Sequence, residues 1–260
     1  MLLVIDVGNT EVTTGLFRGV ELVGRWRLTT GVERTPDEWA VALESFAIRA
    51  GFSPAEIGAC CVGSVVPGVT HSLIQALHLS LDGPVVLVDP REPLSLVLDV
   101  DEPLAVGADR IASMLGALAL YPGDSIVIGF GTATTFNCVT ADRRFIGGSI
   151  MPGLRTSADQ LVRRAAKLTA TELLPPTRAI GRTTDDNIRA GVLFGAADAA
   201  DGMVRRILAE WPSVARPPQV IATGGLASLV APLMAAKPIV DGDLTLHGLR
   251  IAAESLNLRG

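Results

Sequence analysis

The chain has 260 residues, enough for one large or two medium domains, and 48% of them are hydrophobic, which favours a packed globular protein over a disordered one. The formal net charge of -5 argues against a nucleic-acid-binding role, because nucleic-acid-binding surfaces usually carry a basic patch. No apolar run approaches the length of a membrane span, and the first residues do not read as a signal peptide. We therefore expect a cytoplasmic protein with neither a nucleic-acid partner nor a membrane partner.

In the first half of the chain, predicted strands alternate with predicted helices, as in an α/β sheet. Hydrophobic patterning predicts strands over residues 2–7, 12–17, 23–29, 57–66 and 84–88. A Thr cap, a Pro at the first helical position and acidic residues in the first turn predict a helix from Thr35 to about Ala50. Further helices are predicted over residues 69–81 and 111–120.

The second half repeats this order. Strands are predicted over residues 125–130, 135–140, 144–150 and 219–223, and helices over residues 154–167, 185–211, 226–235 and 246–256. Residues 171–183 are rich in Pro and Thr and are predicted to be a loop. We therefore divide the chain into an N-terminal α/β domain, residues 1–120, and a C-terminal α/β domain, residues 121–260.

The two halves share a short motif, a buried strand that runs into a Gly-Thr turn. Asp6-Val7-Gly8-Asn9-Thr10 ends the first strand, and Gly129-Phe130-Gly131-Thr132 ends its counterpart. Gly lets the backbone approach a phosphate closely, Asn and Thr supply donors, and a carboxylate at the strand end can hold Mg²⁺. One such hairpin alone is an ordinary turn, but two related by an internal repeat indicate a duplicated nucleotide-binding fold with phosphates held between the halves.

The second candidate site is Gly107-Ala108-Asp109-Arg110, which stands at the start of the helix predicted over residues 111–120. Asp109 falls in the first helical turn, where the helix dipole stabilises a negative charge. One interpretation is an ordinary helix-start acid with Arg110 on the surface. The other is a general base beside an arginine that binds a carboxylate or phosphate.

Seven motifs, taken together and in order, resemble the type III pantothenate kinases, members of the acetate-kinase, sugar-kinase, Hsp70 and actin superfamily. The motifs are Asp6-Val7-Gly8-Asn9-Thr10, Ser64-Val65-Val66-Pro67, Gly107-Ala108-Asp109-Arg110, Phe130-Gly131-Thr132-Ala133-Thr134-Thr135, Gly147-Gly148 with Pro152-Gly153-Leu154, Gly181 with Thr184, and Thr223-Gly224-Gly225. The resemblance implies a duplicated ribonuclease H-like fold, also called the actin-like ATPase fold, with a nucleotide cleft between two α/β domains. It also implies ATP-dependent phosphorylation of pantothenate to 4'-phosphopantothenate, the first step of coenzyme A biosynthesis.

The resemblance also implies roles for individual residues. Asp109 is expected to be the catalytic base, and Gly107, Ala108, Asp109, Arg110 and Thr184 are expected to contact pantothenate. Asp6 is expected to hold Mg²⁺ through the phosphates of ATP. The residues expected to bind ATP are Asp6, Val7, Gly8, Asn9, Thr10, Glu11, Val12, Thr13 and Thr132. The family is expected to form homodimers, in which Thr184 reaches the substrate across the subunit interface, and to need a monovalent cation such as K⁺ or NH₄⁺.

Three positions and one segment depart from the family pattern. The family has Asp, its ligand for the monovalent cation, where this chain has Gly129, so that ligand side chain is absent. Ser113 and Thr183 each stand where Asn is usual, and residues 97–106 lack an aromatic residue expected there. These departures leave three alternatives open: a non-enzymatic relative with a nucleotide-binding or regulatory role, a kinase or phosphatase acting on another small alcohol or acid, and a sugar kinase.

Overall fold

The computed structural model describes residues 1–212 and 216–258. Its contacts divide the chain into two compact units. Unit 1 contains Met1–Leu120, Arg143–Phe145 and Leu244–Gly260, and unit 2 contains Tyr121–Asp142 and Ile146–Asp243. The division differs from the predicted domains because a three-residue segment and the C-terminal helix both join the first unit.

Unit 1 is built on a five-stranded sheet in the order β3-β2-β1-β4-β5. Its strands are β1 (Leu2–Val7), β2 (Glu11–Arg18), β3 (Glu21–Thr29), β4 (Ala59–Ser64) and β5 (Val85–Leu87). Its helices are α1 (Pro36–Arg49), α2 (Pro67–Ser80), α3 (Ala108–Leu120) and α7 (Leu244–Ser255), with 3₁₀ turns η1 (Pro54–Glu56) and η2 (Pro103–Ala105). Strands β1 to β3 pair antiparallel, whereas β1, β4 and β5 are parallel.

Unit 2 has the same strand arrangement, in the order β11-β10-β7-β8-β9. Its strands are β7 (Ser125–Phe130), β8 (Ala133–Thr140), β9 (Arg144–Pro152), β10 (Gln219–Thr223) and β11 (Ile239–Val240). Its helices are α4 (Leu154–Arg164), α5 (Thr184–Glu210) and α6 (Ala227–Val230), with the 3₁₀ turn η3 (Ala231–Leu233). The remaining strand, β6 (Val97–Leu98), belongs to unit 1 and pairs with the first two residues of β9.

The internal repeat predicted from the sequence is therefore confirmed at the level of topology. In each unit a central strand forms an antiparallel hairpin with the next strand and lies parallel to a later one. Asp6 is paired with Thr13 in the first hairpin, and Gly129 is paired with Thr135 in the second. Both are the fifth residue of a six-residue central strand, so Asp6 and Gly129 occupy equivalent positions.

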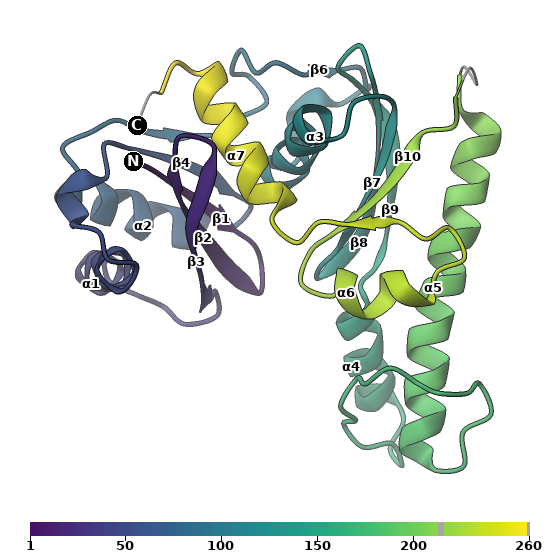
Figure 1. Cartoon of the computed structure of the whole chain (residues 1–260). Helices are drawn as coiled ribbons and strands as arrows, with labels where there is room; N and C mark the ends of the chain where they lie inside the picture. The colour runs from purple at the N-terminus through teal and green to yellow at the C-terminus, as the bar shows by residue number, and fades with distance from the viewer. Residues whose placement is uncertain (213–215, 259–260) are drawn as a thin grey trace. The chain divides into compact units, whose positions relative to one another are not determined.

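The sheet of unit 1 is covered on both faces (Figure 1). Side chains alternate along a strand, and Leu3, Ile5 and Val7 of β1 pack with α1 and α2 in one apolar core. The other face lies against α7, where Leu246 and Val4 approach Gly15 of β2. Asp6 follows Val4 by two residues in the same strand, so its side chain lies on the same face of the sheet, the one covered by α7.

Glycine allows α7 to pack closely on α3. A Cβ atom at Gly248 would lie 1.7 Å from the Ala112 carbonyl oxygen, and one at Gly116 would lie 2.3 Å from the Leu244 carbonyl oxygen. Backbones at this separation leave no room for larger residues. The sequence shows two ordinary helices here, and only the folded chain reveals that they are partners.

Most predicted elements are present, with small differences at their ends. Thr35 caps α1 with a capping box to Glu38, as expected. The helix predicted over residues 226–235 is shorter: α6 ends at Val230 and a 3₁₀ turn follows. Pro232 accounts for this break because proline has no backbone N–H for a continuing α-helix.

The close packing of α3 and α7 predicts a large effect of a single methyl group. Gly248→Ala should lower the free energy of unfolding by about 1–3 kcal/mol or more, because the new Cβ must displace backbone rather than a flexible side chain. Gly68→Ala is the matched control. Gly68 also lies in a helix, but unlike the buried Gly248 it is exposed, and nothing lies within 4 Å of its Cβ position. Urea unfolding of both variants measures the difference; equal stabilities would contradict this account of the packing.

Candidate active site

The sheet of unit 1 brings Asp6 next to the start of α3. Asp6 is paired with Gly63 of the parallel strand β4. A Cβ atom at Gly63 would lie 2.9 Å from Leu249 Cδ2 and 3.7 Å from Ala108 Cβ, so Leu249 of α7 packs directly over this glycine and the first residue of α3 lies beside it. Gly63 was missed by the sequence analysis, yet it leaves the space that Leu249 of α7 occupies over the strand position paired with Asp6.

Asp6 carries a buried carboxylate without a full set of partners. Its Oδ1 atom is buried and makes no hydrogen bond within the described residues. Burial, followed by the negative charge of Asp109, raises the pKa of Asp6 from 3.8 to about 7. A buried, unpaired oxygen is costly, and such atoms in native proteins usually have a partner, which can be an ion. Oxygen ligands of this kind suit Mg²⁺.

The hairpin between β1 and β2 is fixed by a residue far along the chain. Thr30 donates from its Oγ1 to the Gly8 carbonyl oxygen at 2.7 Å and from its backbone N–H to the Thr10 carbonyl oxygen at 3.0 Å. Asn9 and Thr10 at the tip are exposed. The loop thus presents polar side chains from a fixed backbone, and Thr30 is a second residue that the sequence analysis missed.

The predicted ATP-binding segment divides into two groups by burial. Val7 and Val12 are fully buried in the core with α1 and α2, so their side chains do not face a ligand. Glu11 is exposed and forms an ion pair with Arg27 at 3.5 Å. The polar tip of the hairpin, rather than the whole segment, is therefore the part able to present side chains to phosphate.

Gly107 allows Asp109 to fold back over the helix start. A Cβ atom at Gly107 would lie only 2.6 Å from Asp109 Oδ1 and 3.3 Å from Val65 Cγ1. The Gly107 carbonyl oxygen accepts the Ile111 N–H at 3.1 Å, which begins the helical hydrogen bonding. Asp109 and Arg110 are both half-buried, so each combines a fixed position with access from solvent.

The equivalent hairpin of unit 2 is also anchored from outside the hairpin. The Thr132 carbonyl oxygen accepts from the Gly153 N–H at 3.2 Å and from Thr156 Oγ1 at 2.7 Å. Gly153 must be glycine here, because its Cβ would lie 2.3 Å from the same oxygen. Gly224, with φ +92°, packs equally closely on the Phe130 carbonyl oxygen, its Cβ position lying 2.6 Å away.

Gly129 leaves the strand end of unit 2 without a carboxylate. A Cβ atom at this position would lie 2.8 Å from Thr135 Oγ1. A side chain can therefore be accommodated only if the Thr135 hydroxyl moves, which a change of rotamer permits. The feature that makes the Asp6 hairpin acidic is thus absent from its repeat.

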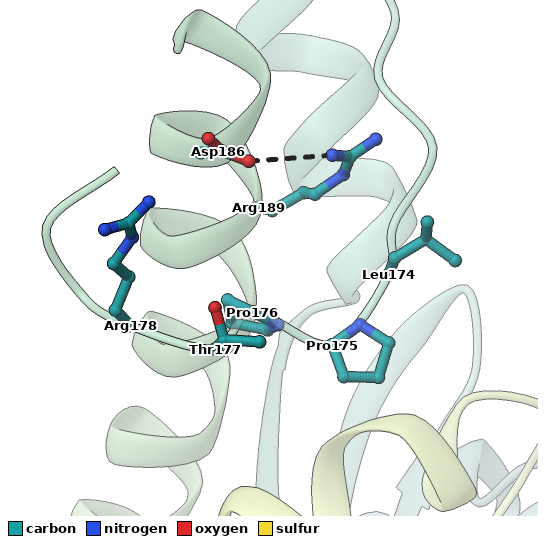
Figure 2. Close-up of a pocket in the computed structure, with 7 residues that line it drawn as sticks. All are labelled: Leu174, Pro175, Pro176, Thr177, Arg178, Asp186 and Arg189. Atoms are coloured by element: carbon teal, nitrogen blue, oxygen red, sulfur yellow. Dashed lines mark ion pairs between the residues drawn. The ribbon is translucent and has the colours of Figure 1, made fainter. Parts of the chain in front are cut away.

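Thr184 lies in a different part of unit 2, as the first residue of α5, and is exposed. Close to it in sequence is a cavity of about 210 Å³ between residues 174–178 and the first turns of α5. Figure 2 shows Asp186 and Arg189 of α5 facing each other beside this cavity, with Nη1 and Oδ1 3.8 Å apart. Thr184 itself does not line it.

The described residues contain no group of three or more His, Cys, Asp or Glu side chains that could enclose a metal ion. Mg²⁺ often binds through one or two carboxylates together with substrate phosphates and water rather than in an all-protein cage. The unpaired oxygen of Asp6 fits that mode. Within the described residues, no helix is long and apolar enough to cross a membrane.

Comparison with known proteins agrees with this geometry. A family model described as type III pantothenate kinase matches residues 2–206. A type III pantothenate kinase from Thermomicrobium roseum is 42% identical over 257 residues, covering 99% of this chain and 98% of the relative.

Solved structures resemble the chain in fold. A conserved protein from Campylobacter jejuni, described as a Baf family transcriptional activator, has a TM-score of 0.61 at 18% identity and covers 98% of this chain and 100% of its own. A ROK hexokinase from Thermus thermophilus has a TM-score of 0.52 at 16% identity and covers 98% of this chain and 99% of its own. The duplicated sheet topology and these neighbours define an α/β protein of the actin-like ATPase fold. Within that class, the chain belongs to the type III pantothenate kinase family.

The raised pKa of Asp6 predicts a specific dependence of stability on pH. Between about pH 4 and pH 7 the carboxyl group is ionised in the unfolded chain but protonated in the folded one, so raising the pH favours unfolding. Above pH 7 the full penalty is present, on the order of 4 kcal/mol for pKa values of about 7 and 3.8. Asp6→Asn removes the charge and should therefore be increasingly stabilising, relative to wild type, as the pH rises from 4 to 7.

Urea unfolding without nucleotide or Mg²⁺ at several pH values measures this difference. Asp6→Ala serves as a second variant, because it removes both the charge and the polar atoms but should show the same pH profile. If the wild-type and variant curves run parallel between pH 4 and pH 8, the buried carboxylate is not being destabilised by ionisation.

Proposed function

We propose that this protein phosphorylates pantothenate to 4'-phosphopantothenate with ATP as the donor, the first step of coenzyme A biosynthesis. The single observation that carries this proposal is the buried, unpartnered Oδ1 of Asp6, which senses the negative charge of Asp109 at the start of α3. Membership of the type III pantothenate kinase family supports the choice of substrate. We expect the protein to act in the cytoplasm, where ATP is available.

Asp109 and Arg110 are the residues to which we assign the substrate. Asp109 would accept the proton of the pantothenate hydroxyl as that oxygen attacks the terminal phosphorus of ATP. Arg110 would pair with the pantothenate carboxylate, since a guanidinium binds carboxylates through parallel hydrogen bonds. Phosphoryl transfer depends mainly on positioning and charge neutralisation, so a fixed base and a fixed arginine meet its needs.

The hairpins are the parts to which we assign the nucleotide. In unit 1, Asp6 would hold Mg²⁺, and Gly8, Asn9 and Thr10 would contact phosphate. Mg²⁺, when bound, neutralises part of the phosphate charge. In unit 2, we assign a phosphate contact to Thr132.

We expect Gly129 to affect the requirement for a monovalent cation and not the role of Asp109 as the base. Because glycine offers no side-chain oxygen, we expect turnover in this chain to be weak or to be independent of K⁺ and NH₄⁺. The alternative of an inactive, nucleotide-binding relative rests on this same position, so one experiment can separate the two.

The deciding measurement is ADP release from Mg-ATP, with and without pantothenate and with and without K⁺. Wild type should release ADP only when pantothenate is present and should show little response to K⁺. Asp109→Asn should lower kcat by about 10²–10⁴-fold, because the variant keeps the shape of the side chain but cannot accept the proton. Gly129→Asp should restore activation by K⁺.

Gly129→Ala is the matched control for Gly129→Asp, because it introduces the same Cβ beside Thr135 without a carboxylate. Strong K⁺ activation of wild type would contradict the role given to Gly129. ATP binding without any turnover, in wild type and Gly129→Asp alike, would support the non-enzymatic alternative instead.

We further propose that the protein is a homodimer formed through α5. Gly191, Gly195 and Ala199 follow one another at four-residue intervals and are exposed, and nothing lies within 4 Å of a Cβ placed at either glycine. Small residues at this spacing share one face of a helix and allow another helix to approach closely. In such a dimer, we assign Thr184 a contact with the substrate of the partner subunit.

The dimer proposal predicts that a bulky charge on this face separates the subunits. Gly195→Arg should shift the protein from dimer to monomer in sedimentation experiments, because an arginine fills the space needed for close helix contact. Gly68→Arg is the control, since Gly68 is likewise an exposed helical glycine with open space around it. A monomeric wild-type protein, or an unchanged mass in Gly195→Arg, would refute this interface.

A further inference from the structure

A buried aromatic ring stacks against Arg110. The Cζ atom of Arg110 lies 5.1 Å from the ring centroid of Phe145, within the range of a cation–π contact. Phe145 is 2% exposed, whereas Arg110 is half-buried. The two residues are distant in sequence, but both belong to unit 1.

Phe145 is held by its own backbone hydrogen bond and by polar contacts of the two residues that precede it. It is paired with Leu98 of β6, and its carbonyl oxygen accepts the Asp99 N–H at 2.9 Å. Arg144 forms an ion pair with Asp99 at 2.7 Å. Arg143 donates from Nη2 to Ser95 Oγ at 2.8 Å.

These contacts tie residues 143–145 to the strand that precedes α3. These three residues belong to unit 1, although the residues on either side of them in the sequence belong to unit 2. Their fixed backbone places Phe145 next to the guanidinium of Arg110.

Stacking leaves the chemistry of the guanidinium usable. An aromatic ring interacts with the flat face of the group, whereas a carboxylate accepts hydrogen bonds from its edge. A ring on the face can therefore restrict the rotation of a long, flexible side chain without competing with a bound acid. The ordering entropy of that side chain is then lost during folding rather than during substrate binding.

We propose that Phe145 is a positioning residue that orients Arg110 and thereby sets the selectivity of the enzyme for a substrate with a carboxylate. The inference rests on the proposed function, because Arg110 is there assigned to the carboxylate of pantothenate. Phe145 does not touch the substrate; it acts through Arg110.

The test compares pantothenate with its neutral alcohol analogue, in which a hydroxymethyl group replaces the carboxylate. Phe145→Leu should raise the KM for pantothenate by about five- to thirty-fold, as expected for loss of a partly desolvated cation–π contact. The KM for ATP and the kcat/KM for the neutral analogue should stay within about two-fold of wild type. Phe145→Tyr, which keeps the aromatic face, should retain the selectivity of wild type.

Two further variants separate positioning from general damage. Phe145→Met also removes the ring but fills similar space, and it takes the place of Phe145→Leu in the test if that variant folds poorly. Thermal unfolding shows which of the two variants is folded, and a folded Phe145→Met protein should show the same selective rise in the KM for pantothenate. Phe136→Leu removes an equally buried phenylalanine from the core of unit 2 and should leave the selectivity ratio unchanged.

The outcomes distinguish the two proposals. Equal losses for pantothenate and the neutral analogue, or no loss for either, in a folded Phe145→Leu or Phe145→Met protein would overturn the role of Phe145. Failure of wild type to phosphorylate pantothenate would overturn the proposed function itself, before any variant is measured. A selective loss for pantothenate in the non-aromatic variants alone would establish the positioning role.

Discussion

The burial of the Asp6 carboxylate, within reach of the negative charge of Asp109, is the constraint on which the rest of the site depends. Burial of the Asp6 carboxyl group and, as the smaller cause, the negative charge of Asp109 raise the pKa of Asp6 to about 7. A protein keeps such an arrangement only if the surrounding packing enforces it or a ligand relieves it. Here the packing enforces it, and a divalent cation with its phosphates is the kind of ligand that would relieve it.

Several glycines allow the close packing that holds Asp6 and Asp109 in place. Gly63 leaves space for Leu249 of α7 over the sheet, and Gly107 leaves space for the carboxylate of Asp109. Gly116 of α3 and Gly248 of α7 bring these two helices into backbone contact. The position of Asp109 therefore depends on small residues at several points, because an added Cβ would press on Leu249 at Gly63, on the Asp109 carboxylate at Gly107, and on the facing helix at Gly116 or Gly248.

The duplicated fold also shows how two copies of one motif can diverge. Asp6 and Gly129 occupy the same place in equivalent strands, and both hairpins are anchored by hydrogen bonds from outside the hairpin. Only the first copy retains an acid. Since the backbone of the second hairpin persists without a carboxylate, the loop geometry and the acid at the strand end are separable properties of the fold, and one can be absent while the other remains.

The sequence by itself determined the alternation of strands and helices, the internal repeat and the residues of the two hairpins, because hydrophobic periodicity and glycine-rich turns are local signals. It also placed Asp109 and Arg110 at a helix start. Only the tertiary structure decided that α7 packs against α3 and that Phe145 lies on Arg110, since neither partner carries a local signal of the other. Long-range contacts arise from backbone spacing and strand pairing, which no short stretch of sequence encodes.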